Sequence, residues 1–150
     1  GFSLIRRMLE NFPDAESLEL DGRPLIEHLL EPTRIYVNAI GDLLGATDVK
    51  GISHITGGGL TENIPRVLPE GLSVSLQQAA WRTPAIFRWL EENGVTKKEM
   101  LRTFNCGVGM VVIVAPEHAE LALSSLTQSG ESAWLIGEVV ADSTKRVMVN

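Results

Sequence analysis

The chain has 150 residues, of which 44% are hydrophobic and 21% charged, and its formal net charge is -6 at pH 7. This length fits a single domain with one sizeable core, and the composition excludes collagen-like, low-complexity and mostly disordered proteins. The negative charge argues against binding of nucleic acid through bulk electrostatics, because such proteins usually carry a basic face.

The first third of the chain predicts three helices. Apolar residues recur at helical spacing over residues 4–9, 25–30 and 39–44, and the second and third of these segments end near Pro32 and Gly45. Ser3 is expected to cap the first helix, which starts almost at once and without an initiator Met, so we expect a fragment of a longer protein. Removal of a tag or propeptide would leave the same start.

Strands alternate with helices in the middle of the chain. Residues 51–56 are rich in β-branched side chains and predict a strand, which three glycines separate from a helical segment over residues 60–67. Residues 72–76 alternate apolar and polar side chains, as a strand with one wet face does. Helices are expected over residues 84–92 and 97–104, and Thr96 and Glu99 form a capping box for the second helix.

The last third predicts more strands around one helix. Residues 108–114 are apolar without a break, which is typical of a strand buried on both faces, and residues 117–128 have helical periodicity. Residues 134–140 and 146–149 are expected to form a hairpin that turns at residues 142–144. The whole pattern predicts one α+β domain, an α/β sandwich with one mixed β-sheet covered by helices.

The main candidate site is the glycine run Gly57, Gly58 and Gly59 between the strand and the helix. Glycines there can take positive φ and leave backbone N–H groups free to converge on an anion, so phosphate is the natural ligand. The run is neither a Walker A loop nor a dinucleotide fingerprint. The alternative is a sharp structural turn without a ligand.

Polar residues around the glycines favour a binding role. His54 and Thr56 share one face of the strand, and Thr61, Asn63 and Arg66 follow within two turns of helix. Arg66 suits a phosphate and Asn63 a directed hydrogen bond, while His54 suits catalysis. The alternatives are a satisfied core histidine for His54 and a solvated helix face for Arg66.

A second glycine-bearing loop contains Asn105, Gly107 and Gly109, which we expect to lie near the first loop. Cys106 between them is interpreted as a small buried thiol rather than a nucleophile, because no histidine is near it in sequence. The three tryptophans, Trp81, Trp89 and Trp134, are expected in the core or an interface.

The single cysteine cannot form an internal disulfide, which favours a reducing cytoplasm. No apolar run approaches the roughly 18 residues that span a bilayer, and no ligand cluster has the spacing of a metal site. We therefore expect a cytoplasmic domain with no bound metal of its own, no membrane contact and no nucleic-acid partner.

Several stretches of the sequence together resemble one enzyme family. They are residues 54–60 with the continuation 62–69, residues 103–110, residues 29–36 and the opening 1–4, and they run in order along essentially the whole chain. The family is phosphoribosylformylglycinamidine cyclo-ligase, also called aminoimidazole ribonucleotide synthetase.

The resemblance implies that residues 1–150 are the C-terminal domain of a two-domain enzyme of purine biosynthesis. In that family ATP activates the formyl amide oxygen of formylglycinamidine ribonucleotide, an internal nitrogen closes the imidazole ring, and ADP and phosphate leave. The absent N-terminal domain is expected to hold most of the ATP and Mg²⁺ site and the homodimer interface. This chain alone is then expected to be inactive.

The implied partners are a nucleotide substrate, the chain's own N-terminal domain and a second copy in a homodimer. Two alternatives stay open. One is a related ATP-dependent enzyme, such as selenophosphate synthetase, thiamine-monophosphate kinase or the formylglycinamidine ribonucleotide synthase of the preceding step. The other is a non-catalytic assembly or regulatory domain.

Overall fold

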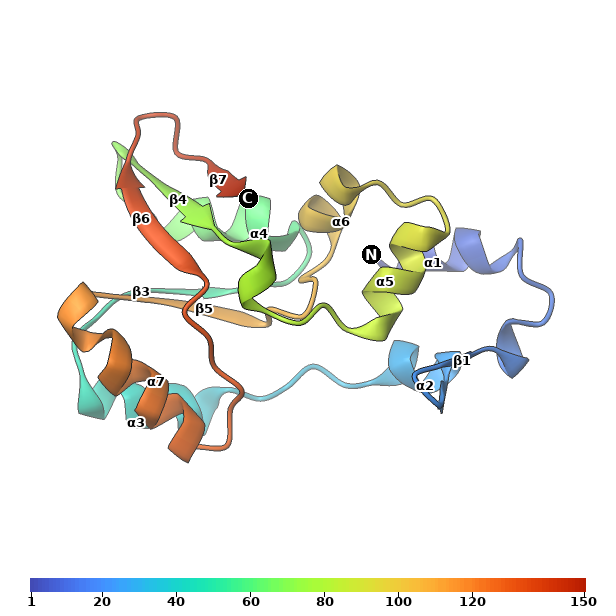
Figure 1. The fold of residues 1–150 in the computed structure, drawn as a ribbon, viewed down its shortest axis with the longest axis horizontal. Coiled ribbons are helices and arrows are strands. Elements are labelled where there is room, and N and C mark those ends of the chain that lie inside the picture. Colours follow the sequence, from blue (N-terminus) through green and yellow to red (C-terminus); the bar gives the residue numbers. More distant parts are fainter.

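The computed structural model describes the backbone of residues 1–150 and every side chain except that of Glu16. The molecule is elongated and has two lobes, with the N-terminal helices at one end and most of the strands at the other (Figure 1). Of the helices in this described part, none is long and apolar enough to cross a membrane.

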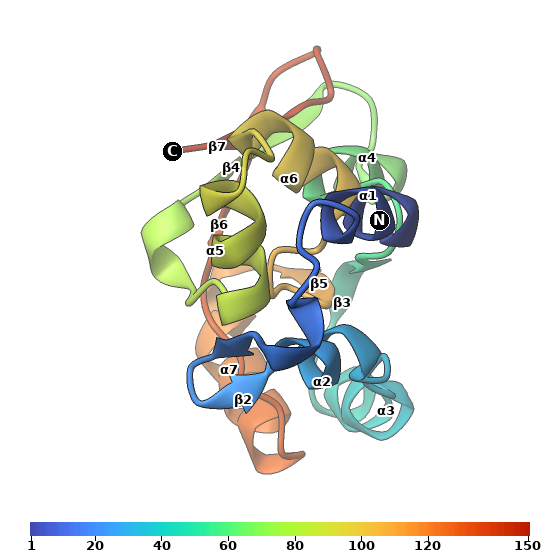
Figure 2. The same ribbon diagram turned by 90° about the vertical axis from the view of Figure 1, so that its right-hand side faces the viewer.

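The first lobe is mainly helical and has its own apolar core. Trp89 and Leu90 lie at the centre of this core, and Ile5, Leu25 and Met100 pack around them. An end-on view shows the helices and a small strand pair gathered here (Figure 2). Its elements are α1 (Phe2–Leu9), η1 (Ala15–Ser17), the antiparallel strands β1 (Glu19–Leu20) and β2 (Arg23–Pro24), α2 (Leu25–Leu30), α5 (Ala85–Glu92) and α6 (Lys97–Thr103).

The second lobe is built on an antiparallel strand pair, β3 (Val49–His54) with β5 (Met110–Val114). One face of this pair is covered by α3 (Val37–Ala46) and α7 (Ala119–Gln128), the latter preceded by η4 (Pro116–His118) (Figure 1). Val111 and Ile113 of β5 face the other way and join a second apolar core. Both faces of β5 are thus covered, which explains its unbroken apolar sequence.

A three-stranded mixed sheet completes this lobe. β4 (Leu72–Leu76) lies in the middle, antiparallel to β6 (Gly137–Ala141) and parallel to β7 (Val147–Val149). Val74 and Leu76 point into the second core, together with Trp81 after the short η3 (Gln78–Ala80). The sheet therefore packs through its apolar face against the β3–β5 pair.

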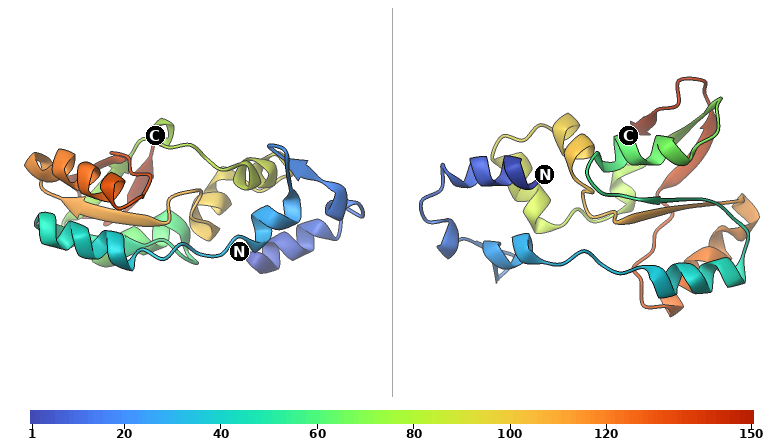
Figure 3. Two further views of the ribbon diagram at one scale, coloured as in Figure 1. Left: turned by 90° about the horizontal axis from the view of Figure 1, so that it is seen from below. Right: turned by 180° about the vertical axis from the view of Figure 1, so that it is seen from behind.

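The lobes are joined by segments that run along the molecule. One is the connector formed by residues 31–36, which leads from α2 to α3 (Figure 3). On another crossing, β3 leads into α4 (Gly59–Asn63) and η2 (Ile64–Val67), and α4 contacts α6. These crossings bring loops from both lobes together at the middle of the molecule.

The α+β class is confirmed, and nearly all expected helices and strands occur within a few residues of their predicted bounds. The expected cap is also present, since Thr96 Oγ1 accepts a hydrogen bond of 3.3 Å from the Glu99 amide. The strands are divided among three small sheets instead of one. Only the sheet β6–β4–β7 is mixed.

The predicted hairpin between the last two strands is wrong. A turn does form where expected, because Asp142 Oδ1 accepts hydrogen bonds from the amide and the hydroxyl of Thr144. β4 nevertheless lies between β6 and β7, and the Ser73 hydroxyl accepts from the Arg146 amide at 2.9 Å. A long-range pairing has replaced the local one.

The three tryptophans differ in burial. Trp81 and Trp89 are buried in the two cores, as predicted, but Trp134 lies before β6 and is 43% exposed. It lines a smaller cavity of about 290 Å³ between β5, α3 and α7.

Candidate functional site

The two glycine loops meet at one cavity of about 550 Å³ in the middle of the molecule. It brings together six of the ten residues that the sequence proposed for the site, and the other four lie outside its lining. Those inside are His54, Thr56, Gly57, Asn105, Gly107 and Gly109, and those outside are Gly58, Gly59, Asn63 and Arg66.

A backbone hydrogen bond joins the two loops directly. The Ile55 amide donates to the Gly109 carbonyl at 3.0 Å, which extends the pairing of β3 with β5 by one step. Ile55 and Leu60 on either side of the glycines are both buried in the second core. The first loop is therefore held at both ends by apolar packing, and its glycines turn the chain between these anchors.

Gly59 needs to be glycine for packing. Its φ is +55°, and an added Cβ would overlap the backbone carbonyl oxygen of Leu101 at the end of α6. Gly58 also has positive φ, at +100°, and a Cβ there would lie 3.0 Å from Glu62 Cβ. These two glycines serve the turn and its contact with α6.

Gly57 is different, because an added Cβ would meet nothing within 4 Å. It is exposed, it lines the cavity, and its φ is outside the left-handed region. Among the backbone hydrogen bonds of the described residues, none has the Gly57 or Gly58 amide as its donor. The backbone at Gly57 thus has both the space and the free N–H that an anion would need.

Asn63 holds the glycine loop in shape through hydrogen bonds to its carbonyl oxygens. Its side chain is 4% exposed, and Nδ2 donates to the carbonyl oxygens of Thr56, Gly57 and Gly59 at 3.3, 3.2 and 2.8 Å. We expected this amide to face a ligand. The structure directs it at the loop's own carbonyls, so its effect on any ligand would act through the loop's shape.

Arg66 lies on η2, is exposed, and does not line the cavity. Thr61 also turns away from the cavity, because its hydroxyl donates to the Leu101 carbonyl at 3.3 Å. The helical side of the glycine run therefore contributes less to the cavity than its sequence suggests. α4 has only five residues, so a helix dipole adds little there.

His54 ends β3 at the edge of the cavity and is exposed. Its ring meets the ring of Tyr36 edge to face, with centroids 5.9 Å apart and an interplanar angle of 73°. The satisfied core histidine that we considered is not what the structure has. The imidazole is accessible from the cavity.

The second loop is held by hydrogen bonds and by packing on Pro84. The Asn105 carboxamide oxygen accepts from the Gly107 amide at 3.0 Å, and the Trp81 indole donates to the Cys106 carbonyl at 3.1 Å. Gly107 has a φ of +95° and packs on Pro84. Asn105 Oδ1 thus accepts a hydrogen bond within its own loop, and the residue also lines the cavity.

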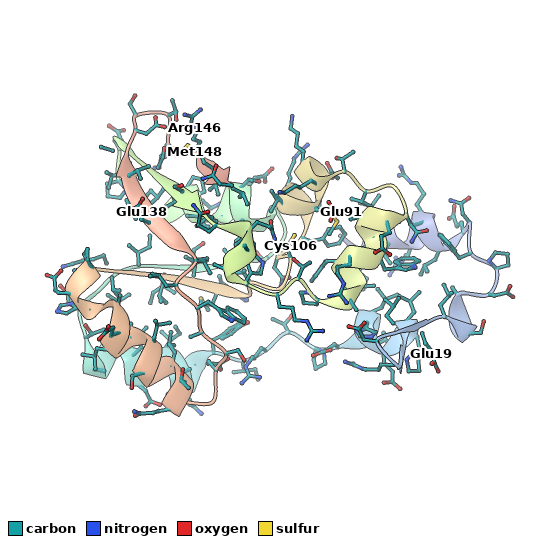
Figure 4. All side chains as sticks on the ribbon, viewed as in Figure 1. Glu19, Glu91, Cys106, Glu138, Arg146 and Met148 are labelled. Atoms are coloured by element: carbon teal, nitrogen blue, oxygen red, sulfur yellow. The ribbon has the colours of Figure 1, made fainter. Side chains whose placement is uncertain are left out.

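Cys106 has the surroundings of a structural thiol. It is 4% exposed, and its Sγ lies 3.5 Å from the Met100 carbonyl oxygen. Burial, with a smaller contribution from Glu91, raises the pKa of the thiol to about 12. Figure 4 shows it near the middle of the molecule, between the lobes. The expected buried, non-nucleophilic thiol agrees with this geometry.

The sequence reasoning missed the connector as part of the site. Thr33, Arg34 and Tyr36 line the same cavity as the glycine loops, although none of them was proposed. The signal was available, because residues 29–36 are among those that carry the family resemblance. They lack the glycines and histidine that draw attention to a site.

We also searched the described side chains for a metal site. Across the side chains that the structure describes, no group of three or more His, Cys, Asp or Glu is placed to hold a metal ion. The residues present therefore do not fit a magnesium site of their own.

Comparison with known proteins places the sequence in a family. The whole chain, residues 1–150, matches the family described as AIR synthase related protein, C-terminal domain.

Proposed function

The chain belongs to the family of AIR synthase related proteins, C-terminal domain, and from this we propose that it serves an ATP-dependent cyclo-ligase of purine biosynthesis. The proposed reaction converts formylglycinamidine ribonucleotide and ATP into aminoimidazole ribonucleotide, ADP and phosphate. The chain would act as the C-terminal domain of a two-domain, homodimeric, cytoplasmic enzyme.

The observation that supports a binding role most directly is the convergence of three segments on one cavity. The glycine loop, the second loop and the connector are separated in sequence, yet each contributes to the same 550 Å³ space. These are also the segments that resemble the cyclo-ligase. A cavity of this size suits a small phosphorylated substrate.

Within this cavity we propose that Gly57 and the neighbouring amides meet a phosphate group. The ribose 5'-phosphate and the transient phosphorylated amide are both candidates for that group. His54 would exchange a proton with the reacting part of the substrate, since its imidazole is accessible at the cavity edge. Asn63 would hold the loop in shape through its three carbonyl contacts.

ATP and Mg²⁺ would be held mainly outside this chain. Because the described side chains include no cluster of three or more His, Cys, Asp or Glu placed to hold a metal ion, we derive no step through the ion from them. The chain's own contribution is to bind and orient the phosphorylated substrate. Arg66 is exposed on η2 beside the loop and lies outside the lining of this cavity.

The test is turnover by the complete enzyme with a panel of substrates. Formylglycinamidine ribonucleotide should give ADP and aminoimidazole ribonucleotide, whereas selenide and thiamine monophosphate should not be phosphorylated. His54→Ala should lower the maximal rate while the melting temperature stays near wild type. Turnover of selenide or thiamine monophosphate would instead assign the chain to a related enzyme. A folded enzyme that turns over none of these substrates would assign it to a non-catalytic role.

A further inference from the structure

Tyr36 lies at a junction between the two glycine-bearing loops. Its ring lies edge to face with His54, and its hydroxyl lies against Gly109, where an added Cβ would overlap it. Tyr36 lines both the 550 Å³ cavity and the smaller apolar cavity beyond it. Tyr36 therefore contacts both loops and forms part of the wall of both cavities.

The surroundings of Tyr36 favour a neutral hydrogen-bonding group over a phosphate. Glu131 lies close enough to act on it, and this carboxylate is paired with Arg34 through an Nε–Oε2 distance of 2.6 Å. Burial, with Glu131, raises the pKa of the phenol, and Arg34 partly offsets this. Tyr36 is thus a neutral phenol at neutral pH, and the Arg34 guanidinium beside it is already paired with Glu131.

Gly57 contributes a surface of a different kind to the same cavity. Gly57 offers open backbone with space around it, and Thr56 and His54 lie next to it. A ligand with a phosphate at Gly57 would direct its uncharged part toward Tyr36. Hydroxyl groups of a sugar are partners that a phenol can both donate to and accept from.

We propose that Tyr36 is a positioning and specificity residue that binds the hydroxyl-bearing, uncharged part of a phosphorylated sugar whose phosphate lies at Gly57. This inference rests on the anion site in the proposed function. It adds the residue that recognises the rest of the ligand. A matching role for Arg34 and Glu131 is to fix the connector, since Arg34 also donates to the Gly130 carbonyl at 2.8 Å.

The chain contains a single tyrosine, so ring-labelled tyrosine gives a signal that reports on Tyr36 alone. We would titrate the 150-residue chain with ribose 5-phosphate and, separately, with inorganic phosphate. The ring signal of Tyr36 should shift with ribose 5-phosphate, while inorganic phosphate should shift the Gly57 amide and leave the ring unchanged. Tyr36→Phe should weaken ribose 5-phosphate binding about two- to tenfold, as expected for one neutral hydrogen bond.

Phosphate binding supplies the internal control, because Tyr36→Phe should leave it and the melting temperature unchanged. Equal affinity of both proteins for ribose 5-phosphate, with no ring shift, would overturn the role of Tyr36 and leave the anion site standing. A ring shift with inorganic phosphate as large as that with the sugar would place the phosphate at Tyr36 and overturn the assignment. Binding of neither probe would remove the anion site and this inference together.

Discussion

Asn63 and Arg66 are three residues apart, yet they differ completely in their surroundings. Asn63 is buried and donates to three carbonyl oxygens of the glycine loop, whereas Arg66 is exposed on η2. Residue type suggested the same ligand-binding role for both. The two residues differ in burial because the loop folds back over α4. The spacing of residues in the sequence does not reveal this fold of the loop.

Asn63→Ala is therefore expected to destabilise the chain by about 1–3 kcal/mol, since the buried Gly59 carbonyl and two part-buried carbonyls lose their donor. Asn63→Asp should be worse, because a carboxylate would face those carbonyl oxygens. Arg66→Ala is the matched control and should change stability by less than about 0.5 kcal/mol. Chemical denaturation of the three variants measures this, and an unchanged midpoint for Asn63→Ala would contradict the bracing role.

Cys106 provides a prediction that depends on pH. Its folded pKa of about 12 is above the ordinary value of 9.0, so the folded state keeps the thiol proton that the unfolded state loses. The resulting stabilisation is fully present below about pH 9 and is lost as the pH rises toward 12. Stability of the wild type should fall over this range more steeply than that of Cys106→Ala.

The same burial predicts slow chemistry at Cys106. A disulfide reagent at pH 8 should label the native thiol only as fast as the chain opens, and denaturant should make labelling rapid. Rapid labelling of the folded protein would show that the thiol is accessible and would remove the basis for the pH prediction as well.

At the scale of elements, the helices were predictable because their information is local. The apolar spacing of residues 25–30 and the Thr96 cap act within a few residues, and both elements occur where expected. The pairing of strands was not local. β4 inserts between β6 and β7, and part of this arrangement depends on Ser73, a buried hydroxyl 73 residues from its partner Arg146.

The candidate site was predictable in the same partial way. Its glycines and His54 were visible in the sequence because those residue types have special backbone or proton chemistry. The convergence of the connector on the cavity was not, since Tyr36 meets Gly109 only through the tertiary fold. Periodicity indicates which face of an element is apolar, but not which distant loop will lie beside it.

The glycine loop can be tested as an element by comparing two of its glycines. Gly59→Ala should destabilise by more than about 2 kcal/mol, because its φ is +55° and a Cβ would overlap the Leu101 carbonyl. Gly57→Ala has free space and no positive φ, so its stability should stay within about 1 kcal/mol of wild type.

The effect on substrate binding should be clearest in Gly57→Ala, the variant that keeps its stability. Gly57→Ala places a methyl group where we propose the phosphate to bind, so the complete enzyme should keep its melting temperature and lose substrate affinity. Gly58→Ala would mix both effects, because its φ is +100° and its Cβ would meet Glu62. Wild-type kinetics together with wild-type stability for Gly57→Ala would mean that the loop is only a turn.

At the scale of the whole molecule, two apolar cores are connected through α6. The first core surrounds Leu90 and the second surrounds Leu60, and Leu101 packs against both. The carbonyl of Leu101 also accepts the Thr61 hydroxyl. The candidate site lies between the lobes. Coupling of the two cores should therefore fix the positions of the site's loops relative to one another.

Leu101→Ala should therefore weaken this coupling as well as lower stability. Its loss should be about 1–3 kcal/mol, since Leu101 is only partly buried. Trp89 reports on the first core and Trp81 on the second, so two single-tryptophan proteins, each without Trp134, can follow the lobes separately. In the parent sequence both probes should show one coincident thermal transition. With Leu101→Ala the two midpoints should separate, because each core keeps its own packing but loses its shared side chain.

Leu90→Ala is the control, because Leu90 is fully buried in the first core alone. It should lower both midpoints together if the lobes remain coupled. Coincident transitions in Leu101→Ala would show that the lobes are held together by other contacts, and that Leu101 contributes to stability without linking them.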